Sequence, residues 1–207
     1  MGGSKVIGAD EVGSGDTFCG LVVSAACVTD EQEEYLRSHR VRDSKRISDS
    51  MIGQYVALIT EAGVRHSTIV VSPLQLNRLL AEGLPHVEIQ NMMYERAIGS
   101  LIQKVGKPDK VYVDQYPGAR ISIDHQSLEL VPGAGEKYLC VAAASIMARS
   151  AYLGMRRCLE RELGMPIPLG SSKVEELLRH MIHNEVDITK YAKLYPNNVR
   201  DLLRELR

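Results

Sequence analysis

Two adjacent carboxylates follow a short apolar run near the start of the chain. Val6 to Ala9 is apolar, and Asp10 and Glu11 come directly after it. Like charges this close oppose each other's ionisation unless a cation or a proton lies between them. The pair is therefore either a solvated pair where a strand ends, or part of a site that binds a metal ion or a proton.

A second apolar run ends in the same way. Val111 to Val113 is followed by Asp114. If the two runs form neighbouring parallel strands, their carboxyl ends lie together, where open α/β sheets bind ligands. Asp10, Glu11 and Asp114 are then within reach of one divalent ion, although Asp114 taken alone is also typical of a turn.

The chemistry of this donor set indicates a hard cation. Carboxylates without a nearby cysteine or a clear histidine partner suit Mg²⁺ or Mn²⁺ better than Zn²⁺. Such ions support phosphoryl transfer, in which one ion generates the attacking hydroxide and a second stabilises the leaving oxygen. His180 and His183 have a spacing that can bind metal, but the same spacing is typical of a solvated helix end.

Three other segments carry groups that can contact a ligand. Gly13-Ser14-Gly15 is a tight turn or a loop that presents bare backbone amides, and it lacks the rest of a dinucleotide-binding motif. Lys45 and Arg46 lie in a charged loop, which is either simply solvated or in contact with phosphates. Ser145 follows the small residues Ala142 to Ala144, which suit close helix–sheet packing, and its hydroxyl can also donate to a phosphate.

An α/β body must position these groups, and the hydrophobic pattern predicts one. Strands are predicted at Lys5–Ala9, Phe18–Val28, Thr68–Val71, Lys110–Val113, Ile121–Ile123 and Leu128–Val131. Helices are predicted at Glu31–His39, Asp49–Ala62, from Pro73 to Gly83, His86–Val105, Leu139–Leu163, Ser171–Ile182, Asp187–Leu194 and Asn197–Leu206. We expect one domain over residues 1–207, with an α/β body to about 169 and a helical extension from about 170.

Composition restricts the class of protein. A net charge of -1 argues against a broad basic face that coats nucleic acid, but it allows an enzyme that touches a few phosphates. No apolar stretch reaches the length of a membrane span, so no membrane partner is expected. The four cysteines, Cys19, Cys27, Cys140 and Cys158, form no C-x-x-C pair and predict buried thiols in a reducing, cytoplasmic protein. A monomer is the default expectation.

Several segments, in order along the chain, resemble the type 2 ribonucleases H. Asp10 to Asp16, D-E-V-G-S-G-D, resembles the signature of ribonuclease HIII, whereas the related ribonuclease HII usually has Arg in place of Ser14. A second highly specific match is Val141–Arg149, which is similar to the A-A-A-S-I-x-A-R helix start. Supporting similarities link Arg42–Arg46 to the D-S-K-K loop, Val111–Asp114 to the strand of the third acid, and Gly170–Val174 and Ala192–Tyr195 to C-terminal segments.

The resemblance, which is carried by motifs such as D-E-V-G-S-G-D, implies an RNase H-like fold with a mixed five-stranded sheet flanked by helices. It implies metal-dependent endonucleolytic hydrolysis of the RNA strand of RNA–DNA hybrids, leaving 5′-phosphate and 3′-hydroxyl ends. The Gly13-Ser14-Gly15 backbone would contact 2′-hydroxyls, which distinguish RNA from DNA. Two alternatives stay open: incision at single ribonucleotides in duplex DNA, as in ribonuclease HII, and a non-catalytic module that binds hybrids.

The resemblance also implies a fourth acid shortly before the A-A-A-S helix. Glu136 is the candidate, although the usual preceding Lys is absent and the spacing to Ser145 is one residue short; Asp124, farther upstream, is the fallback. Ribonuclease HIII commonly carries an N-terminal substrate-binding domain, and only nine residues precede Asp10. We therefore expect no such domain and weaker or less selective hybrid binding.

Overall fold

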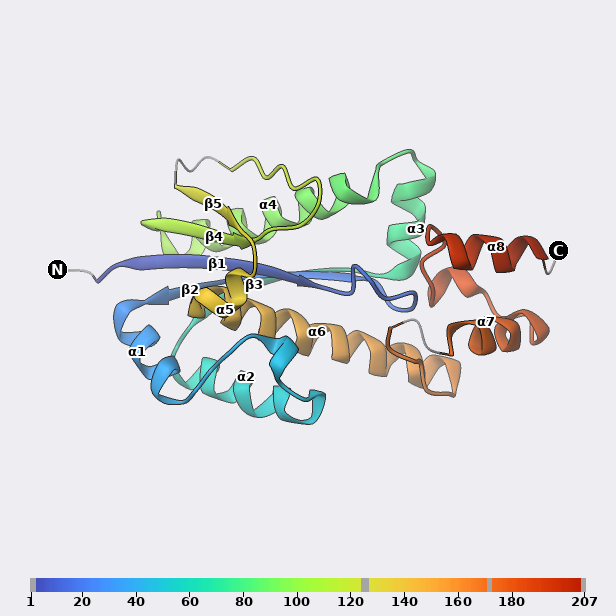
Figure 1. Cartoon of the computed structure of the whole chain (residues 1–207), viewed down its shortest axis with the longest axis horizontal. Helices are drawn as coiled ribbons and strands as arrows, with labels where there is room; N and C mark the ends of the chain where they lie inside the picture. The colour runs from blue at the N-terminus through green and yellow to red at the C-terminus, as the bar shows by residue number, and fades with distance from the viewer. Residues whose placement is uncertain (1–2, 124–126, 171–172, 206–207) are drawn as a thin grey trace.

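A mixed five-stranded sheet forms the centre of the molecule in a computed structural model that describes residues 3–123, 127–170 and 173–205 (Figure 1). The strands are β1 (Lys5–Val12), β2 (Leu21–Thr29), β3 (Arg65–Val71), β4 (Lys110–Asp114) and β5 (Leu128–Val131). Their order is β3-β2-β1-β4-β5, with antiparallel pairs among β1, β2 and β3 and parallel pairs from β1 to β4 and from β4 to β5. The predicted fold, and the parallel pairing of β1 with β4, are confirmed.

Helices cover both faces of the sheet (Figure 1). One core lies between the sheet and α3 (Pro73–Ala81) with α4 (His86–Val105). The opposite core includes α1 (Asp30–Ser38), α2 (Ile52–Glu61) and α6 (Leu139–Leu163). The tail helices α7 (Val174–His183) and α8 (Asn197–Glu205) lie beyond one end of the sheet. Shorter segments are α5 (Ala134–Lys137) and the 3₁₀ turns Ser44–Arg46, Asp49–Met51 and Ile188–Lys190.

The start of α6 packs directly on the backbone of β1. A Cβ atom on Gly8 would lie 2.2 Å from the backbone nitrogen of Val141, so only glycine allows this approach. Ala142, Ala143 and Ala144 are completely buried in the same region. The small residues therefore serve close helix–sheet packing, and this packing fixes the position of Ser145 relative to β1.

Two predicted elements are wrong for identifiable reasons. Ile121–Ile123 is not a strand, because α4 side chains bind this segment: Glu95 accepts a hydrogen bond from the Ser122 backbone at 2.7 Å. The helix predicted at Asp187–Leu194 is only the turn Ile188–Lys190, because the residues after it pair with the loop that follows β1, through a Phe18–Ala192 bridge.

The cysteines are all free, but they differ in exposure. Cys19, Cys27 and Cys140 are buried as predicted, whereas Cys158 is exposed. Cys158 lies in the C-terminal half of α6, where the helix has passed the end of the packed alanine stretch. Among the described residues, no helix combines the length and apolar character needed to cross a membrane.

Candidate active site

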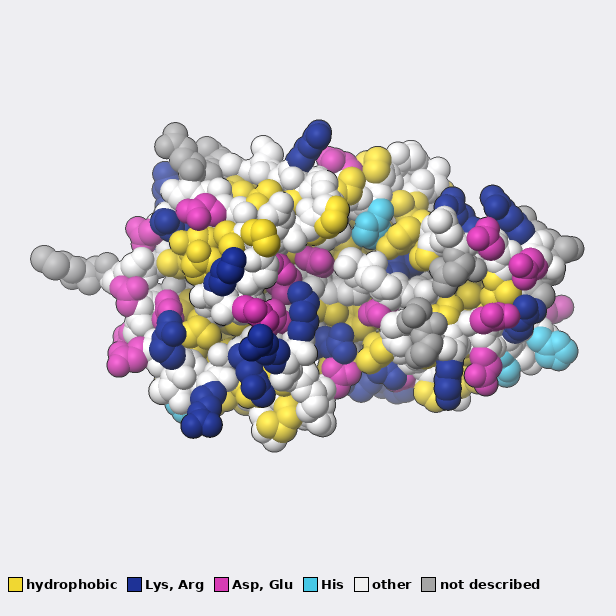
Figure 2. Space-filling model, viewed as in Figure 1, with side chains coloured by type: hydrophobic (Ala, Val, Ile, Leu, Met, Phe, Trp, Pro, Cys, Tyr) yellow, Lys and Arg dark blue, Asp and Glu magenta, His cyan; other side chains and the backbone are white. Residues whose placement is uncertain are grey.

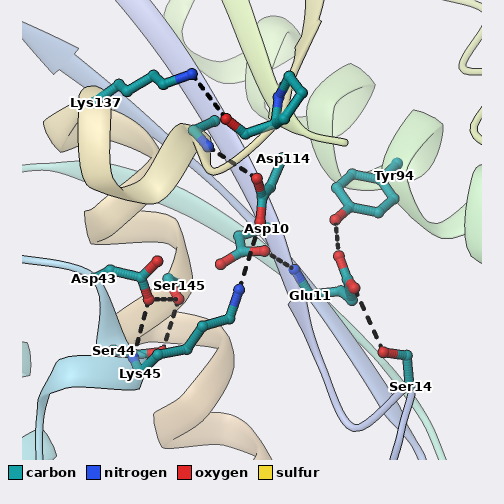
Figure 3. A network of polar contacts seen from close by, with 12 residues as sticks. Asp10, Glu11, Ser14, Asp43, Ser44, Lys45, Tyr94, Asp114, Lys137 and Ser145 are labelled. Carbon is teal, nitrogen blue, oxygen red and sulfur yellow. Dashed lines mark hydrogen bonds and ion pairs between the residues drawn. The ribbon is translucent and has the colours of Figure 1, made fainter. Parts of the chain in front are cut away.

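Both N-terminal carboxylates lie inside β1, which continues three residues farther than predicted. β2 extends the pairing, because Asp10 is opposite Ser24 and Val12 is opposite Val22. On the other side, the pairing of β1 with β4 ends at Ala9 and Val113. The next residue on β4 is Asp114, so the end of this short strand brings the third predicted carboxylate beside the first two (Figure 3).

The alternation of the strand separates Asp10 and Glu11 between the two faces of the sheet. Asp10 points toward α6, close to Ser145, whereas Glu11 accepts a hydrogen bond from the Tyr94 hydroxyl of α4 (Figure 3). Asp114 accepts a hydrogen bond from the Ala134 backbone at 2.8 Å. Elements from both faces thus hold the three carboxylates around one end of the β1–β4 pair.

Asp10 carries the least compensated charge of this group. Its side chain is 2% exposed, and Oδ1 accepts a hydrogen bond from the Glu11 backbone at 2.8 Å, but Oδ2 is buried without a hydrogen-bond partner. Burial, followed by the charge of Glu11, raises the pKa of Asp10 to about 8, although the Ser145 hydroxyl lowers it. Burial also raises the pKa of Glu11 despite the hydrogen bond from Tyr94. A cation at this position would stabilise both carboxylates.

Lys45 provides a positive charge beside the group. Its ammonium lies 3.6 Å from Asp114 Oδ2, and its side chain is largely exposed. Burial of the ammonium lowers the pKa of Lys45, but Asp10, Asp43, Asp114 and Glu11 outweigh this effect and raise it. The ammonium therefore faces four carboxylates at once.

The donor chemistry of the site fits a hard divalent cation. As the described side chains stand, no three acidic, histidine or cysteine groups are gathered closely enough to hold a metal ion. The unpartnered oxygen of Asp10 nevertheless lies near Glu11 and Asp114, and carboxylate oxygens are the ligands that Mg²⁺ and Mn²⁺ prefer.

A cleft of about 440 Å³ opens beside Glu11. It is lined by β1 and the loop after it, by the Ser44–Arg46 turn and by α6. Its walls are Glu11, Val12, Gly13, Ser14, Asp16, Ser44, Lys45, Ile47, Ser145 and Arg149. Acidic and basic side chains gather across the middle of this face of the molecule (Figure 2). The cleft therefore joins acidic groups to cations, a combination that suits a phosphodiester backbone.

The C-terminal extension holds the Gly13-Ser14-Gly15 loop in place. The Lys193 ammonium donates a hydrogen bond to the Gly13 carbonyl, and the Tyr195 hydroxyl donates to the Ser14 carbonyl at 3.1 Å. Lys193 is completely buried, and burial lowers the pKa of its ammonium to about 8. Sequence reasoning matched the segment of Lys193 and Tyr195 to a family motif but missed this contact, which joins residues 180 positions apart.

The structure does not bring Glu136 into the group of carboxylates. Its side chain is 56% exposed and pairs with Arg46 at 2.7 Å. Both residues line a pocket of about 210 Å³, whose walls also include Asp43 and Gly135. In α5 it is Gly135 that is buried, and successive helical residues point about 100° apart, so Glu136 turns outward. The fallback, Asp124, lies outside the described residues.

Ser145 is 1% exposed, and its hydroxyl is occupied within the protein. It shares a 2.7 Å hydrogen bond with the Ser44 hydroxyl and donates weakly to Asp43 at 3.5 Å. Ser145 therefore joins the turn that carries Lys45 to α6, and its contact with a phosphate stays a prediction. Sequence reasoning assigned no role to Asp43, Tyr94 or Arg149. Asp43 and Arg149 lie inside the matched motifs, whereas nothing in the sequence singles out Tyr94.

Comparison with known sequences identifies relatives of this chain. The profile of the Ribonuclease HII family matches residues 7–202. A ribonuclease HIII of Streptococcus gordonii is 32% identical over 94% of this chain and 70% of its own length. A ribonuclease HIII of Streptococcus pneumoniae is 33% identical over 86% of this chain, and the match covers 64% of that protein. The matches thus leave about a third of these relatives uncovered.

Solved structures agree as well. Bst-RNase HIII in complex with Mn²⁺ superposes with a TM-score of 0.88 at 27% identity, over 100% of this chain and 71% of that chain. The ribonuclease H2 of Pyrococcus horikoshii OT3, at 20% identity, shares the fold, with a TM-score of 0.81 over 98% of this chain and 99% of that chain. The chain therefore belongs to the ribonuclease HII family, with ribonucleases HIII among its relatives, and is a ribonuclease H.

Proposed function

We propose that this chain hydrolyses the RNA strand of RNA–DNA hybrids at the site formed by Asp10, Glu11 and Asp114. The observation that carries the proposal is the buried Asp10 oxygen without a partner, which lies beside two further carboxylates. A buried carboxylate is costly unless a cation or hydrogen bonds compensate it. The similarity to a ribonuclease HIII that binds Mn²⁺ supports a divalent ion as this cation.

The three carboxylates would hold Mg²⁺ or Mn²⁺. When bound, such ions supply activation of the attacking water and stabilisation of the leaving oxygen in a two-metal hydrolysis, which gives 5′-phosphate and 3′-hydroxyl ends. Tyr94 holds the Glu11 carboxylate through its hydrogen bond. Lys45 and Arg149, on the walls of the cleft, contact phosphates of the substrate.

The Gly13-Ser14-Gly15 loop recognises the RNA strand. Gly13 and Ser14 line the cleft, and Ser14 is exposed. Backbone groups at this position can contact a 2′-hydroxyl, the group that RNA has and DNA lacks. Lys193 and Tyr195 keep the loop in position from behind.

A cleavage assay with matched variants tests the proposed site. Asp10→Asn and Asp114→Asn should each lower Mg²⁺- or Mn²⁺-dependent cleavage of a labelled hybrid by more than about 100-fold, because each removes a metal ligand. Glu129→Gln is the control, since this exposed acid on β5 pairs with Lys110 away from the site. Wild-type cleavage by both Asp variants would reject the site.

The choice of substrate separates the hypotheses that remain. Ser14, where ribonuclease HII usually has Arg, and the ribonuclease HIII relatives favour continuous hybrids over single embedded ribonucleotides. We expect faster cleavage of a continuous hybrid than of duplex DNA with one ribonucleotide. The reverse order would support the activity of ribonuclease HII, and hybrid binding without metal-dependent cleavage would support a binding module.

A further inference from the structure

The carboxylate of Asp43 occupies the place that a side chain on residue 135 would take. A Cβ atom on Gly135 would lie 2.5 Å from Asp43 Oδ2 and 3.0 Å from its Cγ. We propose that Asp43 supplies the fourth carboxylate of the metal site, in the place where a side chain on residue 135 would otherwise lie. This inference rests on the proposed function.

Space, rather than backbone conformation, makes Gly135 necessary. It lies within α5, directly before Glu136, and its φ is not in the left-handed region. An acidic residue would suit this helical backbone, but its side chain would collide with Asp43. In this chain Gly135 leaves that space to the Asp43 carboxylate, and a side chain on residue 135 would require Asp43 to move.

Asp43 is held firmly in this position. It is 4% exposed, and its Oδ1 accepts hydrogen bonds from the Lys45 backbone at 2.9 Å and from the Ser145 hydroxyl at 3.5 Å. The hydrogen bonds reach Oδ1 only, and Oδ2, unlike the Oδ2 atom of Asp10, is not fully buried. A carboxylate held in place through one oxygen can offer the other, accessible oxygen to a divalent cation.

Asp43 also faces the same site as Asp10. The Ser145 hydroxyl interacts with both carboxylates, so it lies between them. The Lys45 ammonium interacts with Asp10, Asp43 and Asp114. Figure 3 shows the Lys45 side chain extending from the turn that follows Asp43 toward Asp10 and Asp114. Asp10 Oδ2 is buried without a hydrogen-bond partner, so a cation bound beside this oxygen would compensate its charge.

Binding of Mn²⁺ in the absence of nucleic acid tests the inference. Asp43→Asn keeps the Oδ1 acceptor for the Lys45 backbone and removes only the charge. By calorimetry, it should bind Mn²⁺ about 10- to 100-fold more weakly than the wild type, and Mn²⁺ should raise its melting temperature less. Glu136→Gln is the control and should bind Mn²⁺ as the wild type does, because its carboxylate pairs with Arg46.

A reciprocal exchange tests the shared position. Asp43→Ser makes room, so Asp43→Ser combined with Gly135→Asp should recover at least about tenfold of the Mn²⁺ affinity that Asp43→Ser alone loses. Circular dichroism without metal verifies that each variant is folded. Wild-type Mn²⁺ affinity in Asp43→Asn, or a folded double variant that binds no better than Asp43→Ser, would overturn the inference.

Hybrid cleavage by the wild type separates the two claims. If the wild type binds Mn²⁺ through Asp43 but does not cleave hybrids, the inference stands and the proposed function fails. If the wild type cleaves hybrids while Asp43→Asn binds Mn²⁺ with unchanged affinity, the function stands and Asp43 is not a ligand.

Discussion

Asp10 is a carboxylate held almost entirely out of water, next to a second carboxylate on the same strand. Burial and the charge of Glu11 raise its pKa from 3.8 to about 8. Between these values the folded protein keeps a proton that the unfolded chain releases. Without metal, the stability that this proton provides is therefore lost as the pH rises from about 4 to about 8.

Unfolding by urea in the presence of a chelator measures this dependence. The wild type should lose stability between pH 5 and pH 8, and Asp10→Asn should lose less. At pH 8 the variant should be more stable than the wild type by about 1–3 kcal/mol, because an amide needs no cation or proton. Parallel pH profiles for the two proteins would contradict the assigned pKa.

Tyr94, on α4, donates a hydrogen bond to the Glu11 carboxylate. Tyr94→Phe removes the donor to Glu11 Oε2 and leaves only the long hydrogen bond from the Ser14 hydroxyl to Oε1, at 3.5 Å. A hydrogen bond to a charged group contributes about 1.5–3 kcal/mol, which predicts a loss of cleavage rate of about tenfold or more. Tyr116→Phe is the matched control, because this stacked neighbour donates to Asn91 and not to a carboxylate. Equal effects of the two variants would show that Tyr94 acts only through packing.

At the scale of elements, the C-terminal extension acts on the substrate loop through Lys193. Its buried ammonium donates a hydrogen bond to the Gly13 carbonyl, which lies 180 residues earlier in the sequence. Lys193→Met should keep the fold, since it also removes a buried charge, but it should loosen the loop. We expect the KM for the hybrid to rise several-fold with a smaller change in kcat.

Steady-state kinetics on a continuous hybrid measure the effect. Lys190→Met is the control, because Lys190 lies in the same segment but has an exposed side chain whose only ion pair among the described residues is with Asp187. Discrimination against DNA should weaken in Lys193→Met alone. If both lysine variants behave like the wild type, the extension does not position the loop.

The elements differ in how well the sequence predicts them. α4 and α6 have the predicted bounds, because long periodic helices carry strong local signals. β1 continues past Ala9 although two carboxylates disfavour a strand, because pairing with β2 overrides local preference. Asp43 caps the turn at Ser44–Arg46 locally, but Ser44 also bonds to Ser145 of α6, and the first residue of α5 donates to Asp114. No local pattern reveals these two contacts between distant segments.

The candidate site also combines residues that the sequence predicts with contacts that it does not predict. Asp10, Glu11 and Asp114 are predictable because each apolar run, Val6–Ala9 and Val111–Val113, is followed directly by acidic residues. The place of a fourth carboxylate is not, because it depends on the loop at Asp43 packing against Gly135, about 90 residues away in the sequence. Family motifs direct attention to Glu136, which the structure places in an exposed pair with Arg46.

At the scale of the molecule, the net charge is -1, so attraction to nucleic acid depends on a few local cations. Two of them, Lys45 and Arg149, line the cleft. Each neutralised phosphate contributes about -0.9 to the slope of log affinity against log salt for a duplex. We expect a slope of about -2 to -3 for hybrid binding by a cleavage-deficient Asp10→Asn variant. Fluorescence anisotropy at several salt concentrations measures it, and a slope steeper than about -6 would indicate a much broader basic surface.

The central claim is that the carboxylates where β1 and β4 end form the metal-dependent active site. Anomalous diffraction from crystals soaked in Mn²⁺ locates the ion directly. We expect a manganese peak within bonding distance of Asp10 Oδ2 and of carboxylate oxygens from Glu11 and Asp114, under conditions in which the protein cleaves hybrids. A peak elsewhere, or cleavage by a protein with no manganese at this position, would contradict it.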